Sequence, residues 1–476
     1  MEHIEKLFIG YRGRKAITEP TKAGKKYGIV LSFIIFWILF LGNTIYWMAY
    51  FPGGFNLDAY GQWMQVKGDL PLNNWHPAFV TGIYWGLTRI RDSLAFCIFV
   101  QLILFSISLA YLLYIIGRTT RKWHAVFMTA IMISINPAIC LNNVCLTKDV
   151  YFTIEIIWTI IILLRIYLED GECLRGRFLL ILVIISVVQV LTRHNAVLYV
   201  LPMLISVGII WKNKAKSLIV VVTTVLVSSI VIEGPIYSLL NIDPHYNPSG
   251  EVIGVPMSIM ANALVEDPEH IPKDVEAFLL NIADYEMWKT QYITGEWDSI
   301  KWDIETDLLE NVQLSDITCK AVKTIYKCPR ASIHSLMWNT RIIWQVIGKA
   351  EWNTDVYIED NIYGIREQPN KTCLRIVESI ISISESFLGS TVVWNLGGYL
   401  LAFLWLIYFY CKGNKKKGIF IIPLFTYTLF TTCLLSGPNY RYFYYIPVLF
   451  IPISLIITKM HVRNNDYRRE SKNGFS

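Results

Sequence analysis

Apolar runs long enough to cross a membrane recur along most of this chain. The hydrocarbon core of a bilayer is about 30 Å thick, so a helix needs about 20 apolar residues to span it. Such a segment must be helical, because the core offers no water to satisfy backbone N–H and C=O groups. We predict an all-α polytopic membrane protein with about ten transmembrane helices. They are expected at 29–46, 94–116, 123–140, 150–168, 177–192, 196–211, 217–232, 392–411, 418–435 and 442–458.

The composition agrees with residence in a lipid bilayer. Of 476 residues, 54% are hydrophobic and only 17% are charged, which is too apolar for an ordinary globular protein. The formal net charge of +6 raises the question of an anionic partner such as nucleic acid. The basic residues fall instead in short clusters between the apolar runs, the pattern that sets membrane orientation. We therefore expect no nucleic-acid partner.

The positions of the basic clusters predict the orientation. Positively charged flanks of membrane helices are retained in the cytoplasm. Every second junction is basic, and ten helices with both termini in the cytoplasm satisfy all of these clusters. The clusters include Arg12 to Lys26, Arg118 to Lys122, Arg165 to Arg177, Lys212 to Lys216, Lys412 to Lys417 and Lys459 to Arg469.

Residues 233–391 are predicted to form a mainly helical extracytoplasmic domain. Acidic residues outnumber basic ones there by roughly two to one, opposite in sign to the cytoplasmic loops. Helical periodicity appears at 273–283 and 315–326, and the Trp-rich stretch 332–347 is expected to lie on the membrane or to cap the domain. The chain then divides into a seven-helix module (1–232), this domain (233–391), and a three-helix module with a basic tail (392–476).

The first external loop, 51–92, is where a chemical role is first suggested. It carries Asp58 and His76 and is rich in Trp, Tyr, Asn and Gln, so we expect short helices lying at the membrane interface. A loop aspartate is usually only a solvated residue. A role for Asp58 gains weight from the polar residues that the same topology places nearby.

Several costly polar residues are predicted on the same external face. Ionisable groups inside a bilayer cost about 2.5 to 3.5 kcal/mol each and usually face the bundle interior. Lys148, Phe152 and Glu155 share one helical face, which predicts Lys148 or Arg193 as the partner of Glu155. The full set comprises Asp58, His76, Lys148, Asp149, Glu155, Gln189, Arg193, His194, Asn195 and Arg441.

Each of these residues also has a purely structural interpretation. Lys148 and Arg193 could be helix-end residues that snorkel to the surface, and His76 and His194 could be structural hydrogen-bonding residues. Their coincidence on one face favours a polar cavity open to the outside. Arg and Lys there suit a phosphate head group, and a carboxylate suits the role of general base.

Metal and redox chemistry are not indicated. The nine cysteines include no CxxC pair and no His/Cys cluster at metal-ligand spacing. We therefore predict no required cofactor, although a divalent metal stays possible. Cys140 with Cys145, and Cys319 with Cys328, could form disulfides on an exposed face, and their spacing alone does not decide this.

The pattern resembles the class C membrane glycosyltransferases, which use polyprenyl-phosphate-linked sugars and include protein O-mannosyltransferases and the aminoarabinose transferase of lipid A. The resemblance rests on about ten helices, an acidic first external loop at Asn56-Leu57-Asp58, and a large external domain. More narrowly, the motifs look like those of a poorly characterised bacterial family within that superfamily. They are Leu57-Asp58, Asn74-Trp75-His76-Pro77, Thr147-Lys148-Asp149, Thr192-Arg193-His194-Asn195 and Tyr440-Arg441-Tyr442.

The resemblance implies roles for individual residues. Asp58 would be the catalytic base with His76 beside it, and Lys148, Arg193 and Arg441 would bind the donor phosphate. The supporting residues would be Asp149, Glu155, Gln189, His194 and Asn195. Ala59 stands where the mannosyltransferases carry Glu, and no Asp-x-Asp pair follows, which puts metal dependence in doubt.

The predicted function is inverting transfer of a single sugar from an undecaprenyl-phosphate-like donor, at the external face of the cell membrane. The acceptor hydroxyl would belong to an envelope glycan, a lipid or a protein. Two alternatives remain open. One is a lipid-linked saccharide transporter or flippase, and the other is a polysaccharide polymerase or ligase.

Overall fold

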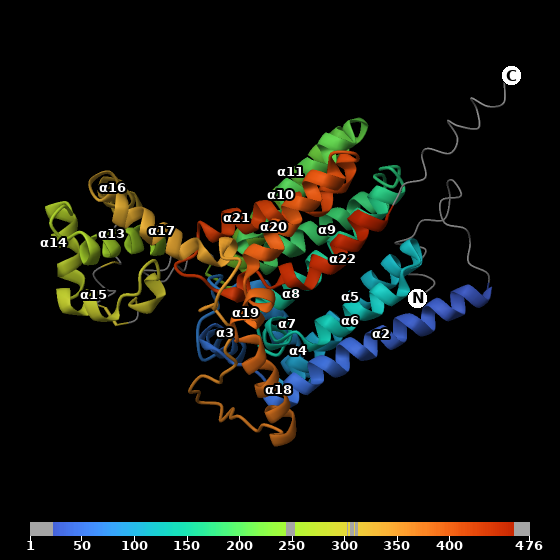
Figure 1. Cartoon of the computed structure of the whole chain (residues 1–476), viewed down its shortest axis with the longest axis horizontal. Helices are drawn as coiled ribbons and strands as arrows, with labels where there is room; N and C mark the ends of the chain where they lie inside the picture. Colours follow the sequence, from blue (N-terminus) through green and yellow to red (C-terminus); the bar gives the residue numbers. More distant parts are fainter. Residues whose placement is uncertain (1–21, 244–252, 302, 305–308, 310–312, 461–476) are drawn as a thin grey trace.

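A computed structural model describes residues 22–243, 253–301, 303–304, 309 and 313–460 (Figure 1). The described chain is helical, and its only β-type contacts are isolated bridges such as Gly54 with Cys145 and Phe55 with Ile358. The predicted basic cluster at Arg12, Arg14 and Lys15 and the predicted tail beyond residue 460 lie outside the described residues.

Five helical segments are long and apolar enough to cross a membrane. These segments lie in α2 (Lys22–Ala49), α5 (Leu94–Thr120), α8 (Lys148–Leu168), α11 (Ala215–Val231) continued by η3 (Ile232–Ile236) and α12 (Tyr237–Leu239), and α22 (Tyr445–Lys459). Two bent helix pairs raise this number to seven if each pair forms one span: α6 (Trp123–Ile135) with α7 (Pro137–Asn143), and α18 (Lys371–Ser384) with α19 (Phe387–Val393). The chain is therefore a multi-pass helical membrane protein by length and composition.

The other predicted crossings contain shorter helices. These are α9 (Arg177–Thr192), α10 (Val197–Ile210), α20 (Leu396–Leu406) and α21 (Ile422–Thr432). The break between α9 and α10 at Arg193 confirms two separate helices there. Each of the ten predicted ranges holds a helix, but a count of ten crossings stays a prediction.

The predicted continuous helix 123–140 is broken at Asn136. Pro137 lacks an N–H and disfavours a helical conformation in the residue before it. The Asn136 side chain accepts a hydrogen bond from the Ala138 N–H at 3.0 Å and so caps the new helix α7. The chain consequently turns by 64° between α6 and α7.

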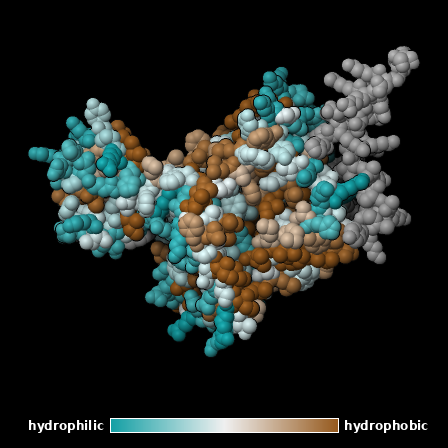
Figure 2. Space-filling view, in the orientation of Figure 1, coloured by the Kyte–Doolittle hydropathy of each residue, from teal (hydrophilic) through white to brown (hydrophobic). Residues whose placement is uncertain are grey.

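The long helices form one bundle around α8. α2 packs against α5 and α6, and α8 packs between α5 and α9, with α10 against α21. Most of α8 is buried, whereas the outward side of α2 exposes apolar residues. Figure 2 shows this side as a brown band along the bundle. α8 is therefore the central helix, and its first residue, Lys148, lies at the end where the polar residues gather.

A separate helical module projects from that end of the bundle (Figure 1). It contains α13 (Gly254–Glu266), α14 (Lys273–Ile282), α15 (Tyr285–Gln291), α16 (Leu314–Lys327) and α17 (Pro329–Trp344), with its own core around Trp288 and Trp297. The helices predicted at 273–283 and 315–326 are confirmed. The 332–347 stretch forms most of α17, which links the module to α20 and α21.

Three further helices lie at the same end of the bundle. α3 (Leu57–Lys67) and α4 (Ala78–Ile90) are the short helices predicted in the first external loop. α18 packs on α2, so the predicted domain 233–391 divides into the projecting module and a part that belongs to the bundle.

Candidate functional site

A cavity of about 680 Å³ opens where the bundle, the first external loop and the projecting module meet. Its wall is formed by segments that are far apart in the sequence. Lining residues with polar or ionisable side chains include Asp58, His76, Lys148, Arg193, His194, Asn195, Asp298, Lys301, Glu351, Asp355 and Arg441. Of the ten predicted site residues, seven line this cavity, and Asp149, Glu155 and Gln189 do not.

The start of α3 places Asp58 in the cavity. The Asn56 side chain accepts a hydrogen bond from the Ala59 N–H at 3.0 Å and caps the helix. The two extended residues Gly54 and Phe55, which precede the helix, form backbone hydrogen bonds with two other segments. Gly54 N–H donates to the Val144 carbonyl at 2.9 Å, and Phe55 N–H donates to the Tyr357 carbonyl at 2.8 Å. Asp58 thus sits in the first helical turn, where a negative charge is favourable.

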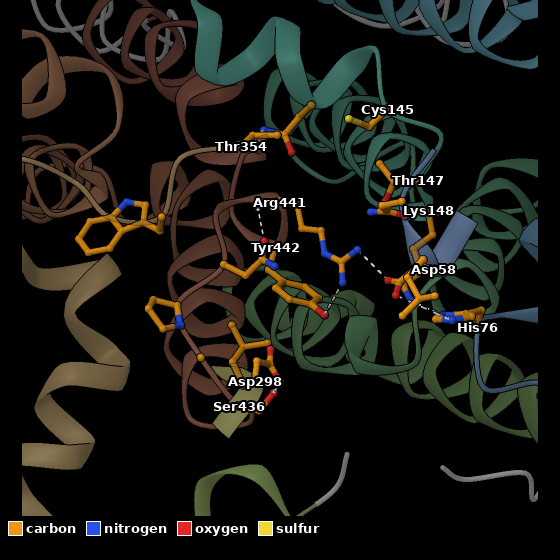
Figure 3. Close-up of a pocket in the computed structure, with 18 of the residues that line it drawn as sticks. Asp58, His76, Cys145, Thr147, Lys148, Asp298, Thr354, Ser436, Arg441 and Tyr442 are labelled. Carbon is orange, nitrogen blue, oxygen red and sulfur yellow. Dashed lines mark hydrogen bonds and ion pairs between the residues drawn. The ribbon is translucent and has the colours of Figure 1, made fainter. Parts of the chain in front are cut away.

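Asp58 lies between two basic side chains (Figure 3). Its Oδ2 is 2.7 Å from Arg441 Nη1, and its Oδ1 is 4.0 Å from His76 Nε2. Burial alone would raise the pKa of Asp58, but the charge and hydrogen bond of Arg441, together with the charge of Lys148, outweigh it and hold that pKa well below its usual range. Asp58 is therefore ionised at neutral pH.

His76 connects Asp58 to Lys148. Lys148 Nζ donates to His76 Nδ1 at 3.3 Å. Burial and the neighbouring Lys148 charge lower the pKa of His76 to about 3, although Asp58 acts in the opposite direction. The imidazole is consequently neutral, with Nδ1 as acceptor, so its proton lies on Nε2 and faces Asp58.

Asp149 and Arg193 form a buried ion pair at the cavity wall, with Arg193 lining the cavity and Asp149 behind it. Their side chains are 1% and 4% exposed. Arg193 Nε also donates to Asn195 Oδ1 at 2.8 Å, and its guanidinium lies 4.4 Å from the centre of the Tyr442 ring. The predicted phosphate ligand Arg193 therefore already has a carboxylate partner, and its position suits support of the wall at Tyr442.

His194 and Asn195 hold the turn between α9 and α10 against other elements. His194 Nε2 lies 2.8 Å from the Asn74 carbonyl oxygen, which ties the turn to the first external loop. Asn195 Nδ2 donates to Thr431 Oγ1 at 3.2 Å on α21. Both residues line the cavity, and the supporting role given to them stays a prediction.

Glu155 and Gln189 lie deeper in the bundle, and the predicted partner of Glu155 is wrong. Glu155 Oε1 accepts from Thr192 Oγ1 at 2.6 Å instead of pairing with Lys148 or Arg193. Gln189 Nε2 donates to Thr159 Oγ1 at 3.1 Å, and Thr159 lies one helical turn after Glu155 on α8. The prediction failed because the nearer carboxylate, Asp149, takes Arg193.

One wall of the cavity could not be predicted from the sequence. Residues 351–355 and Tyr357 line it, and they follow α17 in a stretch without helical or strand periodicity. Asp298 reaches the cavity from the projecting module, where it accepts from Ser436 Oγ at 2.7 Å. Tyr442 stood inside the Tyr440-Arg441-Tyr442 motif and could have been singled out there.

The positions of the cysteines and of residues that could ligate a metal can be compared in the described part of the chain. All nine cysteines are free, including Cys140, Cys145, Cys319 and Cys328. Cys145 Sγ lies 3.3 Å from the Leu141 carbonyl oxygen. Within the described ranges, no group of three or more His, Cys, Asp or Glu side chains is placed to hold a metal ion.

The fold and the cavity define a multi-pass helical membrane protein with an ionisable site at one end of its bundle. Comparison with known families adds one match. Residues 69–306 match the profile of a family of unknown function (DUF6020), and the chain belongs to that family. No curated protein and no solved structure matches the chain. The matched range contains His76, Lys148 and Arg193, whereas Asp58 and Arg441 lie outside it.

Proposed function

We propose that this protein is an integral membrane glycosyltransferase that moves a single sugar from a polyprenyl-phosphate-linked donor to an acceptor hydroxyl, with inversion. One observation carries the proposal. An ionised carboxylate, Asp58, is held by Arg441 and by the His76–Lys148 pair at the wall of a cavity at the end of a membrane bundle. A base beside cations that can hold a phosphate is what such a transfer requires.

The reaction can be written as one displacement. Asp58 takes the proton of the acceptor hydroxyl as its oxygen bonds to the anomeric carbon of the sugar. The bond between that carbon and the phosphate oxygen breaks, and the electron pair leaves with the polyprenyl phosphate. Arg441 and Lys148 would stabilise the charge of this leaving group.

The resting ion pair also supplies a way to activate the base. A carboxylate paired with Arg441 is a weak base, because the arginine charge favours its ionised form. Arg441 Nε is buried without a hydrogen-bond partner among the described residues. A donor phosphate that binds Arg441 would add a partner for the guanidinium and weaken the pair. The pKa of Asp58 would then rise when, and only when, the donor is in place.

The finer topology belongs to the same proposal. We place the cavity on the extracytoplasmic side and the basic junctions in the cytoplasm. Helices α8 and α9 carry their basic ends, near Arg165 and Arg177, away from the cavity, which supports this orientation. The donor lipid would remain in the bilayer while its phosphate enters the cavity. The acceptor would be an envelope glycan, a lipid or a protein.

The test is sugar transfer by the purified protein in nanodiscs, with a panel of radiolabelled polyprenyl-phosphate sugars. Asp58→Asn is the test variant, because the amide keeps the shape and loses the base. Asp360→Asn is the matched control, since Asp360 is exposed and lies outside the cavity. We expect transfer by wild type and Asp360→Asn, and transfer about 10² to 10⁴-fold slower by Asp58→Asn.

Other outcomes separate the alternatives. Donor that binds and crosses the bilayer without being consumed would favour a lipid-linked saccharide transporter. Products that contain more than one added sugar would favour a polymerase or ligase. Transfer that survives in Asp58→Asn would move the base elsewhere and refute the role given to Asp58.

A further inference from the structure

Helices α18 and α19 form a sharply bent hairpin at the cavity end of the bundle. Their axes meet at 94°, and the Ser386 hydroxyl caps α19 by accepting from the Gly389 N–H at 3.1 Å. α18 packs on α2, and the Asn370 N–H donates to the Met48 carbonyl at 2.8 Å. Figure 1 shows the hairpin at the end of α2, on the same side as the first external loop. It therefore lies at the level where α2 ends.

One side of this hairpin exposes apolar side chains. On α18, Ile376 and Ile383 are 48% and 71% exposed, and Ile380 lies between them on the same helical face. The apolar side continues on α19, where Leu388 is 75% and Val392 is 68% exposed. Arg375, Glu378, Ser379 and Ser382 are also exposed on α18 and lie beside the apolar face. A charged face beside an apolar face is typical of helices that lie in the membrane interface.

The apolar side of the hairpin continues a surface that faces lipid. On α2, Leu41, Ile45 and Met48 are 53%, 40% and 40% exposed within a segment apolar enough to cross a membrane. Figure 2 shows brown surface running from α2 into the region of α18 and α19. A continuous apolar patch exposed to water would be unfavourable, whereas a bilayer next to α2 would cover it.

The opposite side of the hairpin holds a wall of the cavity. Ser390 Oγ accepts from the Ala350 N–H at 2.8 Å, and the Trp394 carbonyl accepts from Trp352 Nε1 at 3.0 Å. Asn353 Nδ2 donates to a Glu385 carboxylate oxygen at 3.0 Å. Residues 351–355 line the cavity. The same two helices thus present one side to the outside of the bundle and fasten the cavity wall with the other.

We propose that the α18–α19 hairpin is an interfacial element seated in the lipid bilayer, and that its contact with lipid holds the 351–355 segment in place as a cavity wall. Removal of the hairpin from the bilayer would release its hydrogen bonds to residues 350–353. The inference concerns the partner of this surface and stands whether or not the protein transfers sugar.

The first experiment maps lipid contact on the unmodified full-length protein. Nanodiscs of phosphatidylcholine contain a second phosphatidylcholine with a diazirine on its acyl chain, and labelled peptides are located by mass spectrometry after illumination. We expect label on 376–392 well above that on α14, because an amphipathic interfacial helix buries its apolar face at the boundary of the acyl chains. α14 is the control, because its exposed Leu280 lies in the projecting module. Label on 376–392 no higher than on α14 would overturn the proposal. Cross-links showing that a second copy of the chain covers the apolar side of the hairpin would overturn it as well.

The second experiment tests the connection to the cavity wall. Ile383→Asn with Leu388→Asn makes the apolar side polar, and Leu280→Asn is the matched control. Hydrogen exchange reports the Ala350 amide, whose acceptor is on α19. If the hairpin loses its contact with lipid, hydrogen exchange across 348–353 should become about tenfold faster or more in nanodiscs, because local opening becomes easier. Exchange unchanged from wild type, in a variant that has lost its lipid label, would refute the connection.

Discussion

The Asp58 carboxylate and the Arg441 guanidinium form an ion pair, 2.7 Å from Oδ2 to Nη1, although they stand near opposite ends of the chain. Asp58 belongs to the first turn of α3, and Arg441 to the loop that leads into α22. This pair closes the cavity wall between the first external loop and the last helix. Any ligand that takes Arg441 changes the basicity of Asp58, so the two side chains give a joint set of predictions.

Replacing Asp58 by Asn should separate binding from chemistry. We expect transfer to fall by about 10² to 10⁴-fold, the usual contribution of a general base. We expect decyl phosphate, as a donor-head probe, to bind more tightly than to wild type, because Arg441 loses its carboxylate partner. Calorimetric titration in detergent measures this affinity.

The matched variant is Arg441→Gln, which should weaken decyl phosphate binding. The pair is thereby tested from both sides without a transfer assay. Decyl phosphate that binds Asp58→Asn more weakly than wild type would show that Asp58 supports the phosphate site instead of competing for Arg441.

The pH dependence of stability should carry the signature of His76. Above its ordinary pKa of 6.5, His76 is neutral in the folded and the unfolded chain. Between 6.5 and about 3 only the unfolded chain binds the proton, so stability falls as the pH falls through this window. One such group contributes at most about 1.4 kcal/mol per pH unit.

Thermal denaturation in detergent between pH 4 and 7 measures this slope, and His76→Gln should reduce it. Asp58 contributes to the slope mainly at the acid end of this range, because the stability from its lowered pKa is lost mostly as the pH falls below its ordinary value of 3.8. An equal slope in wild type and His76→Gln would contradict a neutral, buried His76.

The general architecture could be predicted because it depends on local properties of the sequence. Apolar length predicts membrane helices. Each of the ten ranges contains a helix, and five helical segments are long and apolar enough to cross a membrane. Helical periodicity predicted α14 and α16 nearly to the residue, since amphipathic helices in a small module bury one regular face. The bend at Asn136-Pro137 was missed although the proline is a local signal, because hydropathy alone does not distinguish a straight helix from a broken one.

The site was predictable only as a set of residues. Its members stood out because charges are costly in apolar surroundings, and seven of the ten line one cavity. Their pairing depends on distances between helices, which no local pattern encodes. Glu155 was assigned Lys148 or Arg193 by helical spacing, but α9 presents Thr192 to Glu155 and Arg193 to Asp149. The 351–355 wall carried no periodic signal at all.

Asp149→Asn should destabilise the bundle strongly. Asp149 and Arg193 are both nearly completely buried, and removal of one partner leaves an uncompensated charge at a cost of about 3 to 5 kcal/mol. The measurement is the melting temperature in detergent. Asp149→Leu combined with Arg193→Met should recover most of the loss, because two apolar side chains of similar size leave no charge unpaired. A double variant as unstable as the single one would show that the pair is needed for more than charge balance.

Glu155→Gln provides the contrast on the same helix, and here we expect little change. Glu155 accepts a hydrogen bond from Thr192, and a glutamine side-chain oxygen can accept the same bond. We expect a loss below about 1 kcal/mol, the net value of one hydrogen bond, against the much larger loss for Asp149→Asn. Glu155→Leu should cost more than Glu155→Gln, because it leaves the Thr192 hydroxyl without this acceptor. If Glu155→Gln instead matched Asp149→Asn in melting temperature, Glu155 would have a basic partner after all, as its helical spacing from Lys148 first predicted. The buried ion pair that stabilises α8 would then involve Glu155 instead of Asp149.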